Sequence, residues 1–336
     1  MSTEPERSRH RGRVWRLALL GTVSILTGLA MYLAAVVLSL VRMALLGVSD
    51  LTPWVESLLW YSGIPTSFGL VLIVVDLFLL LPGKRRFERR ADSRQPVPDR
   101  VAVALTSYND EASIGDAVRE FLAHPLVSAV IVVDNASRDR SAQVAAEAGA
   151  VVVIEPQAGY GRCVFRALQE LHARADTDYV ALCEGDLTFR ARDLEKLASF
   201  APHADIVNGT RIVEQLRAYD TQLSTFMYYG NFFVGKLLEI KHFGRGTFTD
   251  VGTTYKLLRR DILPDLLAAL DPAINLEFNA AFMDRALGLG YLMVECPITF
   301  HQRVGASKGG NVNNLRALRV GLRMILGLLT DWKLVR

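Results

Sequence analysis

Two long apolar stretches open the chain and predict a pair of membrane-spanning helices. Residues 17–41 contain no charged side chain, and residues 57–81 are interrupted only by Asp76. A helix needs roughly 20 apolar residues to cross a bilayer, so each stretch is long enough. The first stretch is longer than the apolar core of a signal peptide, and no small-residue cleavage site stands out after it. The pattern therefore predicts a transmembrane hairpin over residues 17–82.

Basic residues flank this hairpin at both of its ends and are missing from its loop. Five arginines fall within residues 7–16 and a Lys-Arg cluster covers residues 84–90, whereas residues 47–56 contain neither residue type. Buried core helices would not need this pattern. By the positive-inside rule, both ends of the hairpin lie in the cytoplasm. We expect a multi-pass protein of the cell membrane, with a basic cytoplasmic tail over residues 1–16, a basic linker over 83–100 and the remaining chain in the cytoplasm.

Beyond the linker, short apolar runs alternate with segments of helical periodicity. Strands are predicted at residues 101–106, 129–134, 151–154 and 179–183, and helices at 111–122, 139–148 and 161–174. This alternation predicts an α/β fold, with a mostly parallel sheet and helices on both of its faces. Ligands of such folds bind at the carboxyl ends of the strands.

Two further helices are predicted after this alternating region. Residues 221–241 are dense in aromatic and aliphatic side chains, which suits either a helix packed on the sheet or one lying at the membrane surface. Residues 311–336 carry Arg316, Arg319 and Arg323 on one helical face and leucines on the others. Burying three arginines in a span is costly, so an amphipathic helix at the membrane surface is favoured over a third span.

Composition narrows the function classes only a little. The chain has 336 residues, 51% of them hydrophobic, and a formal net charge of +3. Its basic residues gather beside the predicted hairpin, which favours anionic membrane lipids as partners and gives no nucleic-acid-binding face. Three scattered cysteines (Cys163, Cys183 and Cys296) have no metal-ligand spacing and are interpreted as reduced thiols. Neither glycine-rich phosphate-binding motif, of the dinucleotide or the P-loop type, occurs.

Polar residues follow three of the predicted strands where those strands end. They are residues 106–110, 134–137 and 184–186, and the parallel arrangement brings them to one edge of the sheet. Glu184 and Asp186 are separated by one residue, so both carboxylates of an extended chain point the same way. Two carboxylates on one side suit a hard divalent cation that in turn holds a diphosphate. The sequence therefore predicts a metal and phosphate site at this edge.

Six segments together resemble the ordered motifs of one enzyme family. They are Thr106-Ser-Tyr-Asn-Asp110, Val132-Val-Asp-Asn-Ala-Ser-Arg-Asp139, Glu184-Gly-Asp186, Asn208-Gly-Thr-Arg211, Asp250-Val-Gly-Thr-Thr-Tyr255 with the following residues to Asp261, and the segment from Glu295 to Lys308. The set resembles family 2 glycosyltransferases of the GT-A fold, and more closely the polyprenyl-phosphate sugar synthases typified by dolichyl-phosphate mannose synthase. The resemblance implies a GT-A glycosyltransferase domain over residues 101–310.

The resemblance also implies roles for individual residues. Glu184 and Asp186 would hold Mg²⁺ or Mn²⁺, and Asp186, Arg211 and Asp250 would form the catalytic set. Asp250 is the implied general base if the acceptor is a hydroxyl group. The implied substrate-binding residues are Tyr108, Asp110, Asp134, Asn135, Arg303, Ser307 and Lys308, of which the cations suit phosphate.

Three positions depart from the family pattern. Asn135 follows Asp134 where a second Asp is usual, Glu184 replaces the first Asp of the metal motif, and Thr188 stands where a metal-binding glutamine is often found. Glu184 is one methylene longer than Asp and can still reach a cation. We therefore expect an altered metal shell, not a lost one.

The resemblance implies an inverting glycosyltransferase. It would move a sugar from a GDP- or UDP-sugar to a polyprenyl phosphate at the cytosolic leaflet. Two alternatives stay open: a glycosyltransferase that uses another membrane-side hydroxyl acceptor, and a catalytically silent membrane protein that binds nucleotide sugars. Association with a second copy of the chain also stays open.

Overall fold

The computed structural model describes residues 17–44, 52–80, 97–213, 216, 218, 221, 223–243, 245–305 and 314–335. The chain divides into two compact units. One comprises Gly12–Phe87 with Ile240–Gly244, and the other comprises the rest of the chain. Ser307 and Lys308, both predicted to bind substrate, lie outside the described residues.

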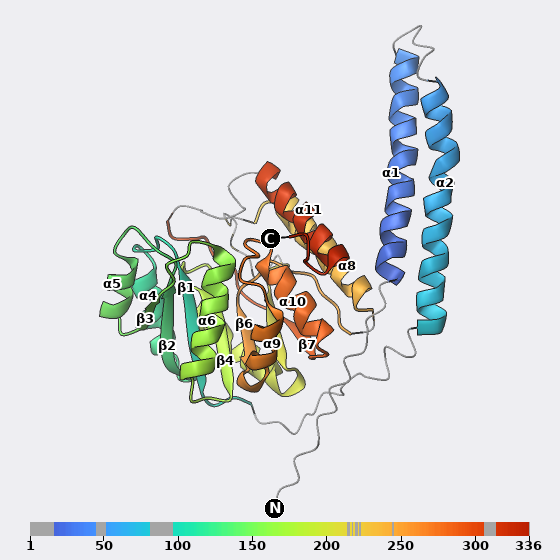
Figure 1. Ribbon diagram of the computed structural model, residues 1–336. Helices are drawn as coiled ribbons and strands as arrows, with labels where there is room; N and C mark the ends of the chain where they lie inside the picture. Colours follow the sequence, from blue (N-terminus) through green and yellow to red (C-terminus); the bar gives the residue numbers. More distant parts are fainter. Residues whose placement is uncertain are drawn as a thin grey trace, which may run out of the picture. The chain divides into compact units, whose positions relative to one another are not determined.

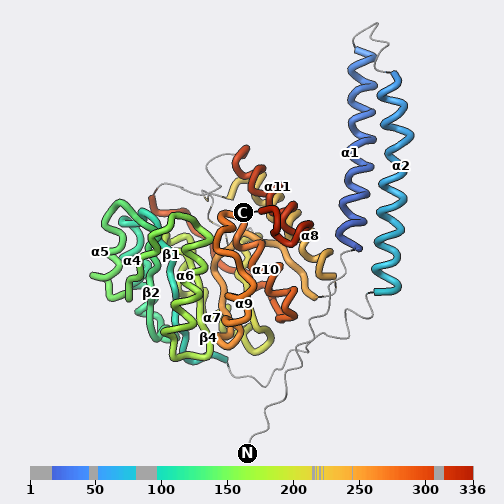
Figure 2. Tube along the Cα trace, in the orientation of Figure 1, coloured from blue at the N-terminus to red at the C-terminus, as the bar shows by residue number. Residues whose placement is uncertain are grey.

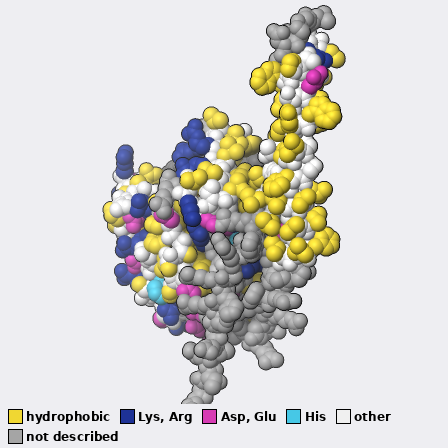
Figure 3. Space-filling view, turned by 45° about the vertical axis from the view of Figure 1, so that its right-hand side comes forward, with side chains coloured by type: hydrophobic (Ala, Val, Ile, Leu, Met, Phe, Trp, Pro, Cys, Tyr) yellow, Lys and Arg dark blue, Asp and Glu magenta, His cyan; other side chains and the backbone are white. Residues whose placement is uncertain are grey.

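The smaller unit is a helical hairpin of the kind that the apolar pattern predicts. Helix α1 (Leu17–Ala44) packs along helix α2 (Thr52–Val75), which continues as the π-helical turn η2 (Asp76–Leu80). Small residues allow the close approach, since a Cβ atom on Gly21 would lie 2.6 Å from the carbonyl oxygen of Gly69. Hydrophobic side chains remain on the outside along the length of the hairpin (Figure 3). Both helices are long and apolar enough to span a membrane.

The larger unit is built on a seven-stranded mixed sheet with the order β3-β2-β1-β4-β6-β5-β7 (Figure 1). Its strands are β1 (Val101–Ser107), β2 (Val127–Asp134), β3 (Val151–Ile154), β4 (Tyr179–Glu184), β5 (Ile206–Thr210), β6 (Lys256–Arg259) and β7 (Met293–Pro297). All neighbours pair in parallel except β6, which runs antiparallel to β4 and β5. The predicted, mostly parallel sheet is therefore confirmed, with one antiparallel strand that the sequence pattern did not reveal.

Helices cover both faces of the sheet. Helix α4 (Ile114–Leu122) and helix α6 (Tyr160–Arg174) both pack on β1 and β2. The connection β1-α4-β2 moves outward and β3-α6-β4 returns across β1, so right-handed crossovers place α4 and α6 on opposite faces. The shorter helices of this unit include α5 (Ser141–Glu147), α7 (Leu194–Phe200), α9 (Leu263–Ala269), α10 (Phe278–Gly288) and the 3₁₀ turns η3 (Ala191–Asp193), η4 (Ala201–His203) and η6 (Arg260–Ile262). Figure 2 shows α4, α5 and β2 at one side of this unit, α9 and α10 near its middle, and α8 and α11 beyond them.

Two longer helices, α8 (Thr225–Lys241) and α11 (Asn314–Thr330), complete this unit. Contacts hold α11 and the residues after it to α10: Arg323 of α11 pairs with Glu277, the residue before α10, at 2.9 Å, and the indole of Trp332, just after α11, donates to Asp284 at 2.8 Å. Each helix has one buried side and one exposed apolar side. The exposed apolar residues are Phe226, Tyr229, Phe232 and Phe233 on α8 and Leu315, Leu318, Leu322 and Leu326 on α11. One side of residues 225–241 is therefore packed on the domain, and the membrane-surface interpretation of its exposed apolar side stays a prediction.

Candidate active site

Three loops at the carboxyl edge of the sheet carry the predicted polar residues. They follow β1, β2 and β4, which are adjacent and parallel. Each loop contains one non-glycine residue in the left-handed region: Asn109, Ala136 and Leu187, with φ of 49°, 56° and 63°. Such conformations cost about 1–3 kcal/mol each and persist only where the surrounding structure holds them. Three of them at one edge single it out as the functional edge.

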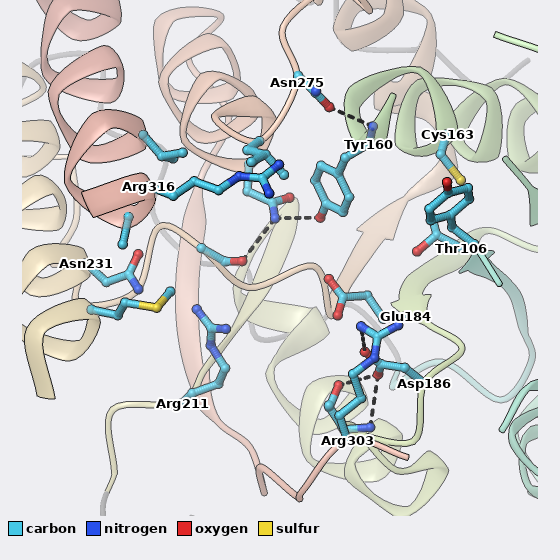
Figure 4. A pocket seen from close by; sticks show the side chains of 18 of the residues that line it. Thr106, Tyr160, Cys163, Glu184, Asp186, Arg211, Asn231, Asn275, Arg303 and Arg316 are labelled. Atoms are coloured by element: carbon cyan, nitrogen blue, oxygen red, sulfur yellow. Dashed lines mark hydrogen bonds and ion pairs between the residues drawn. The ribbon is translucent and has the colours of Figure 1, made fainter. Parts of the chain in front are cut away.

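A cavity of about 430 Å³ opens beside these loops (Figure 4). Its lining combines charged and polar groups from the strand ends with small and apolar residues from α8 and α11. The polar set includes Tyr108, Asp110, Asn135, Tyr160, Glu184, Asp186, Arg211, Asn231, Asn275, Asn279, Arg303 and Arg316, and the helical set includes Phe226, Met227, Gly230, Val234, Ala317, Val320, Gly321 and Met324. The structure thus brings the end of β4 and two helices far along the chain into one site.

Asp186 is the carboxylate that reaches the cavity from the end of β4, and it is almost fully buried. Its Oδ1 accepts hydrogen bonds from the backbone N–H and the hydroxyl of Thr188, at 3.1 and 2.5 Å. Its Oδ2 accepts from Nη1 of Arg303 at 2.8 Å. Thr188 therefore orients this carboxylate, which is the role the structure gives to the residue that departs from the family's glutamine.

Arg303 ties together carboxylates from two different strand ends. Its Nη2 donates to Oδ1 of Asp110 at 2.5 Å while Nη1 holds Asp186. Burial alone would lower the pKa of Arg303, but the charges of Asp186 and Asp110 outweigh burial and raise it. The guanidinium thus stays charged, as the counterion of two acidic residues.

Glu184, the last residue of β4, lines the same cavity two residues before Asp186. Its Oε1 accepts a hydrogen bond from the Thr254 hydroxyl at 2.7 Å. Burial, and after it the charge of Asp186, raises the pKa of Glu184 to about 7. Two acidic groups in one poorly hydrated site repel each other, so the pair has a strong electrostatic preference for a nearby cation.

Arg211 and Asp250 form a two-pronged ion pair. Nε and Nη2 of Arg211 donate to the two oxygens of Asp250, each at 2.7 Å, and the backbone N–H of Gly252 adds a bond of 3.0 Å. Burial raises the pKa of Asp250, but Arg211 and these hydrogen bonds reverse the shift and lower it. Asp250 is fully buried and does not line the cavity, whereas Arg211 does. The carboxylate predicted as a possible base therefore faces Arg211.

Asp134 and Asn135 lie together at the end of β2, but only Asn135 lines the cavity. The Asn135 amide donates to the carbonyls of Glu155 and Gln157 and accepts from the N–H of Gly159, so it fixes the loop before α6. Oδ1 of Asp134 accepts from the N–H of Ser137 at 2.9 Å, while its buried Oδ2 has no hydrogen-bond partner among the described residues. The departure from Asp-Asp to Asp-Asn thus has a structural use.

Several cavity residues were not predicted from the sequence. They are Tyr160, Asn275 and Asn279, which come from α6 and the start of α10, and Asn231 and Arg316 from α8 and α11. Figure 4 shows Arg316 extending from α11 into the cavity. The one available signal was Gly159-Tyr160-Gly161 directly before a predicted helix. A Cβ on Gly161 would lie 1.7 Å from the carbonyl oxygen of Ile274, so this glycine lets α6 approach the start of α10.

The carboxylates suit a divalent cation that is shared with a ligand. Among the described residues, no group of three or more His, Cys, Asp or Glu side chains could enclose a metal by itself. Mg²⁺ in nucleotide enzymes usually takes only one or two carboxylates, with the remaining ligands from water and substrate phosphates. Glu184 and Asp186 provide that donor set, and Glu184 has the electrostatic preference described above. The residues therefore fit such an ion.

Comparison with known proteins identifies relatives over most of the larger unit. The profile of glycosyl transferase family 2 matches residues 102–267. The chain is 27% identical over 227 residues to glycosyltransferase AglJ of Haloferax volcanii. This alignment covers 67% of this chain and 70% of AglJ. It is 26% identical over 211 residues to a dolichyl-phosphate hexose transferase of the same organism, covering 62% and 86% of the two chains. Two further relatives are matched over 53% and 49% of their own length.

A solved structure shares the fold. Glucosyl-3-phosphoglycerate synthase from Mycobacterium tuberculosis, crystallised with Mn²⁺, UDP and phosphoglyceric acid, matches 68% of this chain and 78% of its own with a TM-score of 0.50 and 17% identity. At that identity the similarity is one of fold alone. The solved structure thus agrees in fold with the sequence matches to glycosyltransferases.

Proposed function

Because this chain is a glycosyltransferase of the GT-A fold, with a glycosyl transferase family 2 domain over residues 102–267, we propose that it transfers a sugar from a nucleotide diphosphate sugar to a polyprenyl phosphate at a membrane surface. The reaction is a single displacement. An oxygen of the acceptor phosphate attacks the anomeric carbon, the bond from that carbon to the diphosphate breaks, and the nucleotide diphosphate leaves with the bonding electrons. The anomeric configuration is inverted.

The observation that carries this proposal is the two-sided lining of the cavity. One side bears Glu184, Asp186, Arg211 and Arg303, which suit a diphosphate and its cation. The other side consists of residues of α8 and α11, which are mostly small or apolar apart from Asn231 and Arg316. Among them are Gly230 and Gly321, whose Cβ positions would have no atom within 4 Å. A volume of about 430 Å³ is typical of a ligand pocket. A donor with two phosphates and an acceptor with a lipid tail match these two sides.

The nucleotide is assigned to the ends of β1 and β2. Tyr108 is partly exposed at the cavity, and the Tyr108 N–H and Arg303 both bind Asp110, which stabilises the loop. Oδ2 of Asp134 is buried without a partner among the described residues and does not line the cavity itself, so its proposed role, to accept from a hydroxyl or N–H donor of the nucleoside, follows the family pattern. GDP- and UDP-sugars both offer such donors.

The diphosphate and its cation are assigned to the end of β4. Mg²⁺ or Mn²⁺ held by Asp186 and Glu184 would offset the charge that grows on the leaving diphosphate. Arg211 lines the cavity with its guanidinium oriented by Asp250, so Asp250 acts as a positioning residue. Arg303 releases its hold on one carboxylate when it turns to a phosphate oxygen. Arginine forks bind phosphate in two-pronged geometry, which suits both positions.

The acceptor is assigned as a phosphate because the site has no free base in the predicted place. A phosphate monoester is already largely ionised near neutral pH, with a second pKa of about 6, and needs no strong base. A hydroxyl acceptor does need one, and Asp250 is fully buried against Arg211. Of the carboxylates among the described cavity residues, Asp110 and Asp186 pair with Arg303, which leaves Glu184 as a base, and the proposal places Glu184 on the cation. The relative that is a dolichyl-phosphate hexose transferase supports the phosphate acceptor.

The surface around the cavity suits a lipid bilayer. Exposed aromatic residues on α8 and exposed leucines on α11 belong to the two helices that line the cavity, so an acceptor phosphate could enter while its chain stays in lipid. The helices α1 and α2 would anchor the protein, with the basic segments that flank them at the cytoplasmic side. Anionic lipids are then the expected neighbours of these basic segments.

The test is incubation of the purified full chain with a panel of UDP- and GDP-sugars, each with undecaprenyl phosphate, dolichyl phosphate or the matching free polyprenols, followed by mass detection of glycolipids. The proposal predicts a sugar-phosphate-polyprenol with the phosphorylated acceptors only. A product with the free alcohols would replace the acceptor class by a hydroxyl. Binding of nucleotide sugars with no product on any acceptor would identify a silent binding protein.

A further inference from the structure

A chain of hydrogen bonds leads from Glu184 into a part of the cavity to which no role has been assigned so far. Thr254 donates to Glu184, the hydroxyl of Tyr160 contacts the Thr254 hydroxyl, and Nδ2 of Asn279 donates to the Tyr160 oxygen at 2.7 Å. Tyr160 begins α6 and Asn279 lies in the first turn of α10. The sheet edge and two helix starts thus form one polar wall, which Figure 4 shows from Glu184 to Tyr160 and Asn275.

The donors in this wall all point in one direction. The Thr254 hydroxyl donates to Glu184, which only accepts in its ionised form, and the Tyr160 proton is then directed to the Thr254 oxygen. Burial raises the pKa of Tyr160, so its hydroxyl keeps the proton. The Tyr160 oxygen is left to accept from Asn279. Nδ2 of Asn279 also lies 3.3 Å from the Thr254 oxygen, so both of its protons point into this hydrogen-bonded group.

The orientation of the Asn279 amide follows from a third contact. Nδ2 also lies 3.1 Å from the carbonyl oxygen of Gly252, which can only accept, so the nitrogen must face this carbonyl. Oδ1 consequently points away from it. Asn279 is 3% exposed and lines the cavity, and its Oδ1 has no hydrogen-bond partner among the described residues. A buried polar atom of this kind is unfavourable unless a ligand satisfies it.

The chemistry of this atom selects the ligand group. An unpaired amide oxygen binds a hydrogen-bond donor, whereas phosphate oxygens are acceptors and a polyprenyl chain offers no polar group. The wall is also linked to Glu184, the carboxylate beside the proposed diphosphate position. The part of the donor that follows the diphosphate is the sugar, and its hydroxyl groups are donors.

We propose that Asn279 is a sugar-recognition residue, whose Oδ1 accepts a hydrogen bond from one hydroxyl of the transferred sugar, and that Tyr160 is the positioning residue that aims it. The proposal rests on the proposed function, because it places the sugar of a nucleotide sugar against this wall. It extends the donor site beyond the predicted motif residues to α6 and α10. It also makes the choice of sugar depend on one hydroxyl.

The test pairs protein variants with altered donors. Wild type, Asn279→Ala and Tyr160→Phe are assayed, as full chains with Mn²⁺, on the accepted nucleotide sugar and on its deoxy analogues, each lacking one hydroxyl. One analogue should lose roughly 10- to 100-fold in kcat/KM with wild type. With Asn279→Ala the same analogue should lose less than about 3-fold relative to the parent sugar, because the partner is already gone. The other analogues should lose equally with both proteins.

Tyr160→Phe keeps Oδ1 and removes only its anchor, so it should reduce the penalty for that one analogue by an intermediate factor. A purely structural role of Tyr160 would weaken all donors alike. This variant also serves if Asn279→Ala does not fold. The affinity of the nucleotide diphosphate alone is measured in parallel and should stay within about 2-fold of wild type.

Three results would overturn the proposal. The first is a loss of kcat/KM that is the same in wild type and Asn279→Ala for every deoxy analogue. The second is an affinity of the variants for the nucleotide diphosphate that falls as much as their affinity for the whole donor, which would place the ribose or base at the wall. In both cases wild type still transfers sugar, so the proposed function survives. The third is a wild type that neither transfers sugar nor binds any nucleotide sugar, and this result refutes both.

Discussion

Arg303 holds the place beside Asp186 and Asp110 that a divalent cation would compete for, and its removal gives a sharp prediction. In Arg303→Gln the neutral, shorter side chain cannot bridge the two acids, which are both buried. Breaking a buried ion pair by removing one partner costs about 3–5 kcal/mol, and the lower end applies because the cavity is open to water. A loss of about 3 kcal/mol lowers the thermal unfolding midpoint by roughly 6–12 °C for a domain of this size.

The metal affinity should change in the opposite direction. In wild type an incoming cation must break the 2.8 Å bond between Arg303 and Asp186, and a hydrogen bond to a charged group is worth about 1.5–3 kcal/mol. Removing this competition should tighten Mn²⁺ binding, in the absence of nucleotide, by about 10- to 100-fold. Mn²⁺ should also restore the melting temperature of the variant more than that of wild type.

Electron paramagnetic resonance of free Mn²⁺ during a titration measures the affinity, and differential scanning fluorimetry measures the melting temperature. The matched control is Arg259→Gln, because Arg259 likewise bridges two acids, Asp205 and Asp261, but lies at the opposite end of β4. It should lose stability without changing Mn²⁺ affinity. An unchanged or weaker Mn²⁺ affinity in Arg303→Gln would refute the reasoning that cation and arginine share one site.

Three further predictions concern the buried pair, the pH dependence and the helical side of the cavity. Asp250→Asn should lower the free energy of unfolding by about 3 kcal/mol and kcat/KM by about 10- to 100-fold, since Arg211 loses its counterion. Steady-state kinetics that show an unaltered kcat/KM would argue against the positioning role of Asp250. Burial is the main cause that lowers the pKa of Lys256 from 10.5 to about 7. Between these two pH values Lys256 is protonated in the unfolded state and neutral in the folded state. The free energy of unfolding should therefore rise with pH in this range, by up to about 1.4 kcal/mol per pH unit. Denaturation of wild type and Lys256→Met between pH 7 and 9 checks this, and parallel pH profiles would contradict it. Gly321→Leu should project into the cavity, raise the KM of the lipid acceptor at least about 10-fold and leave the melting temperature within about 2 °C; an unaffected acceptor KM would remove α11 from the acceptor site.

The half of the fold that consists of local βαβ units could be predicted from the sequence. Strand β3 has the predicted bounds, and β1, β2, β4 and α6 differ from the prediction by one or two residues at an end. Each of these elements shows its own periodicity and is bounded by turn residues. Helix α4 begins at Ile114, three residues later than predicted, because residues 111–113 form a turn that joins the site loop.

The other half depends on contacts that no local pattern shows. Strand β6 is short, carries the buried Lys256 and enters the sheet antiparallel between β4 and β5. Its buried lysine is acceptable only because Asn208 on β5 and the carbonyl of Thr253 accept from it. A charged residue followed by two leucines does not indicate a central strand by itself.

The candidate site divides in the same way. The acidic strand tip and the arginines are visible in the sequence because their motifs are local, and the structure gathers Asp110, Asn135, Glu184, Asp186, Arg211 and Arg303 in one cavity. Asn279 and Tyr160 could not be assigned, because an asparagine inside a helix and a tyrosine at a helix start have many ordinary uses. Their meaning arises from the contact between α6 and the start of α10, which Gly161 permits.

The central claim is that Asp186 acts with a divalent cation on a nucleotide sugar. The most direct test measures turnover of the accepted labelled nucleotide sugar by wild type and by Asp186→Asn, with EDTA and then with increasing Mg²⁺ or Mn²⁺. The account predicts that wild-type turnover disappears with EDTA and returns with the metal, and that Asp186→Asn stays at least about 1,000-fold slower at saturating metal, a loss of about 4 kcal/mol in transition-state stabilisation. Equal turnover by the two proteins, or wild-type turnover that EDTA leaves intact, would contradict it.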